Sequence, residues 1–223
     1  MGNPDQIAGL IREVALWSLP VLAAIIFHEV AHGFVALRLG DDTAARLGRL
    51  TLNPLPHIDP VGTILLPGLL VLVGAPVFGY ARPVPVDYGR LRTPRRDMVL
   101  VALAGPATNV ALAALSGFVF RRLEAALGAN AVAPGLATGV LVPLAQMAYY
   151  SVLVNTFLAV FNLLPIPPLD GGRVLTGVLP YAQARALASL EPFGFLIVAF
   201  LLMTHSLGAI LNAPVRLLLQ VLL

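Results

Sequence analysis

Three ionisable residues with the spacing of a metal site lie in an apolar stretch near the N-terminus. The segment His28-Glu29-Val30-Ala31-His32 separates two imidazoles by four residues, which is about one helical turn, so both can bind one ion from the same face. A catalytic zinc ion takes nitrogen or carboxylate ligands and keeps one position for water, and Glu29 is placed to accept a proton from that water. The spacing therefore predicts a metal-dependent hydrolase that needs a third ligand.

The alternative is a chance motif whose histidines only pack against neighbouring helices. Three ionisable groups in an otherwise apolar helix argue against it, because burying them in hydrocarbon costs on the order of several kcal/mol unless they face a partner or an aqueous cavity. The chain has no cysteine and only four histidines. We therefore favour metal binding, with ligands restricted to histidine, carboxylate and water.

Asp170 is the predicted third ligand. It follows the proline-rich run 162–169, and the two glycines after it allow backbone to approach a metal or substrate closely. An aspartate in this position can also cap the start of a helix, and the two roles can coexist. The two remaining histidines are expected to have other roles. His57 is expected to form a structural or gating hydrogen bond, and His205 to be an interfacial or buried packing histidine.

Composition places the chain in a membrane. Hydrophobic residues make up 58% of it, charged residues only 11%, and the mean hydropathy is +0.88, so polar surface is too scarce to cover a soluble globule. Apolar runs that approach or exceed the roughly 20 residues needed to span hydrocarbon cover residues 15–27, 61–78, 98–120, 136–164 and 193–203. We expect one all-α domain over residues 1–223, multi-pass in the cell membrane, with about five to six membrane segments.

The region after the first helix is expected to be irregular. Residues 43–57 suggest short strands, and residues 79–86 carry two prolines that suit an edge strand or extended loop. Glycines and prolines interrupt 61–78, which either spans or re-enters the membrane. Arginine clusters at 38–49 and 82–96 indicate membrane orientation rather than nucleic-acid binding, and the second cluster predicts a cytoplasmic loop. A full crossing by 61–78 would place the clusters on opposite sides, so the topology stays open.

These motifs together resemble the site-2 protease family of intramembrane metalloproteases. The resemblance covers roughly residues 20–180 and rests on HEVAH at 28–32, NPLPHIDPVG at 53–62, AGP at 104–106 with Asn109, and NLLPIPPLDGGRV at 162–174. It implies that His28, His32 and Asp170 bind one zinc ion and that Glu29 is the general base. It also implies that Asn162 positions substrate or stabilises an oxyanion. An interhelical hydrogen bond is the open alternative for Asn162, and packing is expected for Asn109 and Asn155.

The resemblance implies a substrate class as well. Members of the family cleave transmembrane helices of regulatory proteins such as anti-sigma factors, so the expected partners are a membrane-protein substrate and the lipid bilayer, without nucleic acid. A transmembrane helix keeps its amides bonded to itself, so it must unwind before cleavage, and residues 79–86 are expected to hold the unwound strand by edge pairing. Many members carry PDZ or CBS domains that do not fit here, so the chain resembles a minimal form.

Three other classes of membrane protein are alternatives to the protease. A metal-ion or proton transporter that uses buried histidine and aspartate is the main alternative, but it gives Glu29 no special purpose. A di-iron lipid hydroxylase needs many more than four histidines. An inactive binding relative is disfavoured because the motif is intact.

Overall fold

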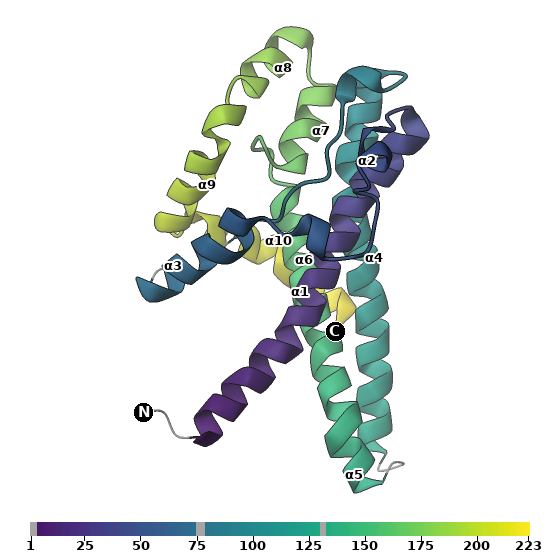
Figure 1. The fold of residues 1–223 in the computed structure, drawn as a ribbon, viewed down its shortest axis with the longest axis vertical. Coiled ribbons are helices and arrows are strands. Elements are labelled where there is room, and N and C mark those ends of the chain that lie inside the picture. The colour runs from purple at the N-terminus through teal and green to yellow at the C-terminus, as the bar shows by residue number, and fades with distance from the viewer. Residues whose placement is uncertain (1–3, 75–78, 130–132) are drawn as a thin grey trace.

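The computed structural model of the chain describes residues 4–74, 79–129 and 133–223. These residues are mostly helical, and no β-strand is assigned among them (Figure 1). Four helical segments are long and apolar enough to cross a membrane, namely Ile11–Leu39, Pro94–Gly128, Pro134–Asn162 and Tyr181–Met203. The prediction of an all-α multi-pass membrane protein is confirmed. The finer prediction of about five to six segments stays a prediction, because the described residues contain four helices of spanning length and two shorter apolar helices, Pro60–Leu70 and Ser206–Leu222.

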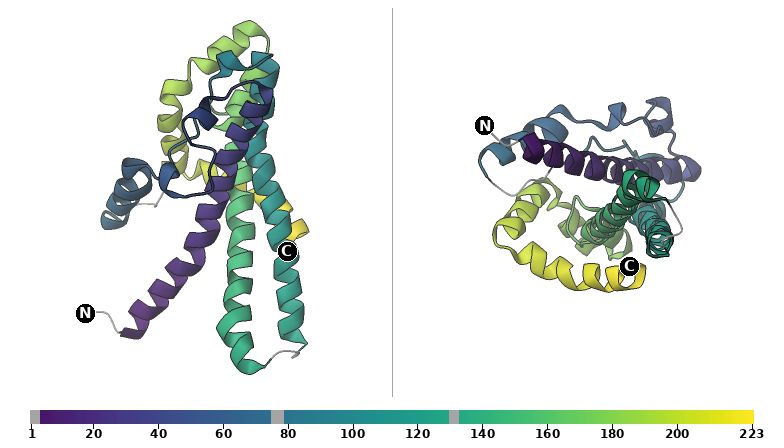
Figure 2. Two further views of the ribbon diagram at one scale, coloured as in Figure 1. Left: turned by 45° about the vertical axis from the view of Figure 1, so that its right-hand side comes forward. Right: turned by 90° about the horizontal axis from the view of Figure 1, so that it is seen from below.

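Three long helices form the centre of the molecule. They are α1 (Pro4–Leu39), α4 (Pro94–Gly128) and α6 (Val142–Asn162), the last continuing from α5 (Pro134–Leu136) and the π-helical turn η4 (Ala137–Leu141). Helices α4 and α6 run side by side, and α1 joins them with its C-terminal half while its N-terminal half diverges (Figures 1 and 2). Small buried side chains permit this close approach; they include Ala24, Ala36, Ala102, Ala113, Ala145 and Ala159.

The expected short strands in residues 43–57 are not formed. The segment contains α2 (Thr43–Arg46) and the 3-10 turn η1 (Leu55–His57), followed by η2 (Pro60–Leu65), α3 (Leu66–Leu72) and, after residues 75–78, η3 (Tyr88–Arg90). Side chains favour turns here because Asn53 Oδ1 accepts the Leu55 N–H at 3.1 Å, which competes with strand pairing. Residues 79–87 run extended without strand pairing among the described residues.

Both arginine clusters lie at the same end of the helix bundle. Arg46 and Arg90, one from each cluster, reach Asp42 Oδ1 at 2.8 and 3.6 Å, and the Arg92 N–H donates to the Leu39 carbonyl at 3.1 Å. The chain therefore returns after α3 to the end that it left after α1 (Figure 1). A single full crossing between the clusters is incompatible with these contacts; the last part of the predicted segment, 75–78, lies outside the described residues.

The C-terminal part wraps around the bundle as a series of short helices. These are α7 (Asp170–Val178), α8 (Tyr181–Ala188), η5 (Glu191–Phe193), α9 (Gly194–Met203) and α10 (Ser206–Leu222). Helix α7 packs on α4, and α10 crosses α6 and reaches α4 (Figure 2). The Leu222 carbonyl accepts a hydrogen bond from Arg121 at 2.6 Å.

Asp41 connects the end of α1 to the loop before α4. The residue is completely buried; its Oδ1 accepts the Thr43 N–H and hydroxyl at 3.0 and 2.5 Å, and its Oδ2 accepts the Asp87 N–H at 2.8 Å. Burial raises the pKa of Asp41, but these hydrogen bonds and the nearby Arg90 outweigh it, so the pKa lies below its usual value. The stabilisation is therefore present above the unfolded pKa of about 3.9 and is lost as the pH falls through the lower folded pKa.

Asp41→Asn should lower the free energy of unfolding at pH 7 by about 1–3 kcal/mol, because the amide has one accepting oxygen for donors on two sides. Thermal unfolding in detergent measures this. Asp42→Asn is the matched control, because Asp42 is partly exposed and forms surface ion pairs that contribute at most about 1 kcal/mol. Equal losses in the two variants would contradict the anchoring role of Asp41.

Candidate metal centre

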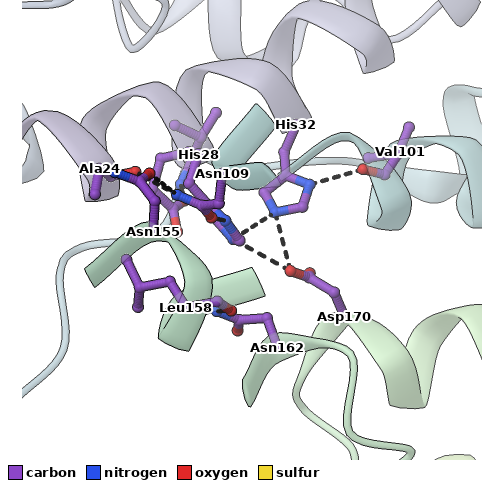
Figure 3. Close-up of polar contacts among 11 residues, drawn as sticks. Ala24, His28, His32, Val101, Asn109, Asn155, Leu158, Asn162 and Asp170 are labelled. Atoms are coloured by element: carbon purple, nitrogen blue, oxygen red, sulfur yellow. Dashed lines mark hydrogen bonds and ion pairs between the residues drawn. The ribbon is translucent and has the colours of Figure 1, made fainter. Parts of the chain in front are cut away.

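His28 and His32 point from α1 towards the start of α7, where Asp170 meets them (Figure 3). The two Nε2 atoms are 3.0 Å apart, and Asp170 Oδ2 lies 3.2 Å from the first and 3.3 Å from the second. All three side chains are buried. The structure thus brings together, from two separate helices, the three residues that the sequence analysis selected as metal ligands.

Hydrogen bonds on the far side of each ring orient the imidazoles. His28 Nδ1 lies 2.5 Å from Asn109 Oδ1, and His32 Nδ1 lies 2.7 Å from the Val101 carbonyl oxygen. Carbonyl oxygens only accept, so both Nδ1 atoms carry the proton, and in the neutral ring each Nε2 presents a lone pair. The two Nε2 atoms and Asp170 Oδ2 therefore face one another as acceptors. A proton can bridge one pair of them, but a cation satisfies all three.

The donor set fits a tetrahedral metal ion. Asp170 Oδ2 is buried without a hydrogen-bond partner among the described residues, as expected for a ligand atom. An ion with ligand bonds of about 2.0–2.1 Å separates its ligands by about 3.3 Å, which agrees with the observed separations of 3.0 to 3.3 Å. Three protein ligands leave a fourth position for water, the arrangement of catalytic rather than structural zinc.

Glycines at the helix contacts make room for this site. A Cβ atom on Gly105 of α4 would lie 2.4 Å from His32 Nε2 and 2.6 Å from His28 Nε2, so only glycine lets α4 pass beside the ligand atoms. A Cβ on Gly171 would lie 2.2 Å from the Leu163 carbonyl oxygen, so the loop before α7 packs directly on its first turn. The N-cap of α7 is Leu169, so Asp170 is the first residue of the helix rather than its cap. The Asp170 carboxylate faces the two histidines.

Asn109 has a role that the sequence analysis missed, because packing alone was expected for it. Besides accepting from His28, its amide donates to the Asn155 side chain at 2.8 Å, and Asn155 donates to the Ser151 carbonyl at 2.9 Å. These bonds link α1, α4 and α6 through the apolar interior and orient the His28 ring. The sequence feature that could have indicated this role is that Asn109 is a polar amide in an apolar helix, one turn after Gly105 and on the same face.

An apolar cavity of about 430 Å³ adjoins the metal centre. His28 and Glu29 line it from α1 and Asn162 from the end of α6, with residues 54–63 and 79–81 on other sides. Glu29 Oε2 accepts the Val84 N–H at 2.7 Å. Asn162 donates to the carbonyl of Leu158 in its own helix at 3.0 Å, and no bond to another helix is found for it within the described ranges. The second N–H of the Asn162 amide is therefore left for other use.

The other two histidines lie apart from the ligand cluster. His57 is 3% exposed, and its Nε2 donates to the Thr51 carbonyl at 2.9 Å, which is a structural hydrogen bond of the expected kind. His205 occupies the exposed corner between α9 and α10 with φ of 57°. Of the two roles expected for His205, buried packing is wrong, because the side chain is exposed where the chain turns in a left-handed conformation. The interfacial role stays a prediction.

Comparison of the sequence with known proteins finds a matching family and several relatives. The family model described as Peptidase family M50 matches residues 17–205. YwhC of Bacillus subtilis, named as a candidate zinc metalloprotease, is 39% identical over 199 residues, which cover 87% of this chain and 85% of that protein. Two Rip2 proteins named in the same way are each 37% identical to this chain. The match to Rip2 of Mycolicibacterium smegmatis covers 84% of this chain and 66% of that protein. The match to Rip2 of Mycobacterium tuberculosis H37Rv covers 89% of this chain and 70% of that protein. No solved structure matches the chain.

Gly105→Ala should prevent metal binding without unfolding the protein, because the added methyl group occupies the space beside both ligand nitrogens. Metal content of the purified variant, determined by mass spectrometry after incubation with Zn²⁺, measures this. Gly128→Ala, at the end of the same helix with no atom within 4 Å of the new Cβ, is the matched control and should bind as the unaltered protein does. Full metal occupancy in Gly105→Ala would show that the ion sits elsewhere.

Proposed function

The chain belongs to peptidase family M50, the site-2 protease family, and on that premise we propose that it is a zinc-dependent intramembrane endopeptidase. The observation that carries the proposal is the convergence of three buried ligand atoms beside a cavity that Glu29 also lines. In this proposal His28, His32 and Asp170 hold one zinc ion per chain. The substrate is a transmembrane helix of a membrane-tethered regulatory protein, such as an anti-sigma factor.

Two polar residues that line the cavity, Glu29 and Asn162, have roles in amide hydrolysis in this proposal. When bound, zinc polarises the scissile carbonyl and makes its bound water acidic near neutral pH. The Val84 N–H holds one oxygen of Glu29, which leaves the other oxygen to take the proton of the water and pass it to the departing amine. The unused N–H of Asn162 donates to the developing oxyanion from the opposite side of the cavity. A transporter, the alternative function, has no such use for Glu29.

The extended segment beside the cavity has one edge for pairing with an unwound substrate. Every second N–H of this segment is bonded inside the protein. The Tyr80 N–H donates to the Gly62 carbonyl, the Arg82 N–H to the His57 carbonyl, and the Val84 N–H to Glu29. On the opposite edge Pro83 and Pro85 have no N–H. The Ala81 N–H has no partner in the described part of the chain, and Ala81 lines the cavity. Substrate pairing by β-augmentation therefore centres on Ala81.

The fold also supports a membrane orientation. Arginines concentrate at the end of the bundle that carries α2, η3 and the start of α4 (Figure 1), which makes that end cytoplasmic by the positive-inside rule. The chain is at this end both before residue 60 and again at Arg90 and Arg92, so in the proposal residues 60–74 enter the membrane without crossing it. His32 lies six residues before Arg38 in α1, so at about 1.5 Å per residue the metal centre is about 9 Å below the cytoplasmic edge.

Glu29→Gln should keep zinc but lose cleavage by more than about 100-fold, because the amide cannot accept the proton of the water. The assay reconstitutes each variant in liposomes with single-span test proteins tagged at both ends and follows cleavage on gels. Glu13→Gln, in the same helix but outside the cavity, should cleave normally. Near-normal turnover by Glu29→Gln would remove Glu29 from this role, and metal flux without any cleavage by the unaltered protein would favour the transporter.

Ala81→Pro should reduce cleavage of a helical test substrate by about tenfold or more while zinc binding is unchanged, because it removes the donor proposed to pair with the unwound strand. Ala81→Gly is the matched control, since glycine keeps the N–H. The initial rate of cleavage in the same liposomes gives the comparison. If Ala81→Pro and Ala81→Gly cleave equally well, edge pairing at this position is not part of substrate binding.

A further inference from the structure

A polar stripe follows the outer face of the last helix. Asn212, Arg216 and Gln220 recur every four residues along α10, so they lie on one face. All three are exposed and, with Ala209 and Ala213, line a groove of about 430 Å³. None of the three polar side chains has a hydrogen bond or ion pair with the described residues. None of them lines the cavity beside the metal centre.

The charges of α4 mark the depth of the hydrocarbon. Asp97 near its start and Arg121 near its end enclose residues 98–120, which carry no charge and extend about 34 Å at 1.5 Å per residue. This length matches the roughly 30 Å of a bilayer core. Aromatic rings lie at the lower limit, where Tyr149 packs on Phe120 with centroids 5.6 Å apart. Such rings gather at the membrane interface.

Helix α10 lies between these limits along its whole length. Near its start, Leu207 and Leu211 pack against Leu164, at the level of the metal centre. At its end, Leu222 packs against Gly117 and accepts the hydrogen bond from Arg121. The helix crosses the bundle obliquely (Figure 1). The polar stripe is therefore at hydrocarbon depth, where an unpaired guanidinium facing lipid is strongly unfavourable.

We propose that this face of α10 docks a transmembrane helix of another protein that carries a carboxylate at the same depth. A carboxylate accepts two parallel hydrogen bonds from the Arg216 guanidinium, and the amides of Asn212 and Gln220 bond to polar groups one turn away. Ala209 and Ala213 form a small-residue pair at helical spacing, which lets the backbone of a partner helix approach closely. The site is distinct from the cavity of the proposed protease.

A second copy of this chain does not supply the required carboxylate. Helix α10 itself has no acidic residue. Of the acidic residues elsewhere that are at least partly exposed, Asp42 and Asp87 lie at the arginine-rich end, Glu124 lies three residues beyond Arg121 in α4, and Glu191 forms an ion pair with Arg173 at 3.7 Å. Pairing two copies through this face would bring no described carboxylate to Arg216. Charge complementarity therefore favours a different protein as the partner.

The absence of cysteine allows a clean binding experiment. The full-length protein with Leu223→Cys is labelled with a donor dye and reconstituted in phosphatidylcholine vesicles with acceptor-labelled synthetic helices of leucine and alanine. One helix carries a central aspartate and the other a leucine in its place. We expect energy transfer to show about tenfold tighter binding of the aspartate helix. Arg216→Gln should reduce this preference to less than about twofold, while its zinc content stays unchanged as evidence of folding.

Arg122→Gln is the matched control, because Arg122 is an exposed arginine on α4 outside the groove, and it should retain the preference. Equal binding of the two helices by the unaltered protein would overturn the proposal, as would an aspartate preference that survives Arg216→Gln. If two labelled copies of the chain showed energy transfer and added aspartate helix did not reduce it, the face would mediate self-association and the proposal would be wrong. If Arg216→Gln changed only the binding of anionic lipid, and the unaltered protein showed no preference for the aspartate helix, the face would be a lipid site and the proposal would be wrong.

Discussion

The structure depends on one constraint, that polar atoms inside hydrocarbon must find partners in the protein or in a bound ion. The motif helix α1 carries three ionisable groups into the membrane, and each is paired on at least one side: His28 with Asn109, His32 with the Val101 carbonyl, and Glu29 with the Val84 N–H. What remains is the set of acceptors formed by the two Nε2 atoms and Asp170 Oδ2. Their mutual proximity is unfavourable without a cation between them, so the surrounding fold supports a metal centre.

The rest of the architecture follows from holding these groups in place. Helix α4 can supply both the Asn109 amide and the Val101 carbonyl only because Gly105 between them has no side chain. The loop before α7 packs against the glycines of that helix and directs Asp170 inward. The extended segment 79–87 supplies the N–H for Glu29, and its attachment to Asp41 at one end fixes it relative to α1. The same residues that position the site thus also hold the bundle together.

The long helices and the three residues that cluster as proposed ligands could be predicted from the sequence, whereas the contacts between segments could not. Long apolar runs and the spacing of His28 and His32 depend on local periodicity, and the unusual Asp170 in a broken apolar stretch pointed to the third ligand. The bond from Asn109 to His28 depends on how α1 and α4 are aligned, which no local pattern specifies. The strands expected in residues 43–57 were wrong because side chains there bond to nearby backbone. The return of the chain to one end of the bundle became evident only from the contacts of Asp42 with arginines of both clusters.

X-ray absorption at the zinc edge of the detergent-purified protein tests the central claim most directly. The account predicts one zinc per chain with two imidazole nitrogens at about 2.0–2.1 Å and oxygen ligands from carboxylate and water at about 2.0–2.2 Å. In Asp170→Ala, any zinc that remains bound should keep the two imidazole ligands. Its carboxylate oxygen should be missing or replaced by a second water. A spectrum with three or more imidazoles, or zinc-free protein after incubation with Zn²⁺, would contradict the assignment of His28, His32 and Asp170 as the ligand set.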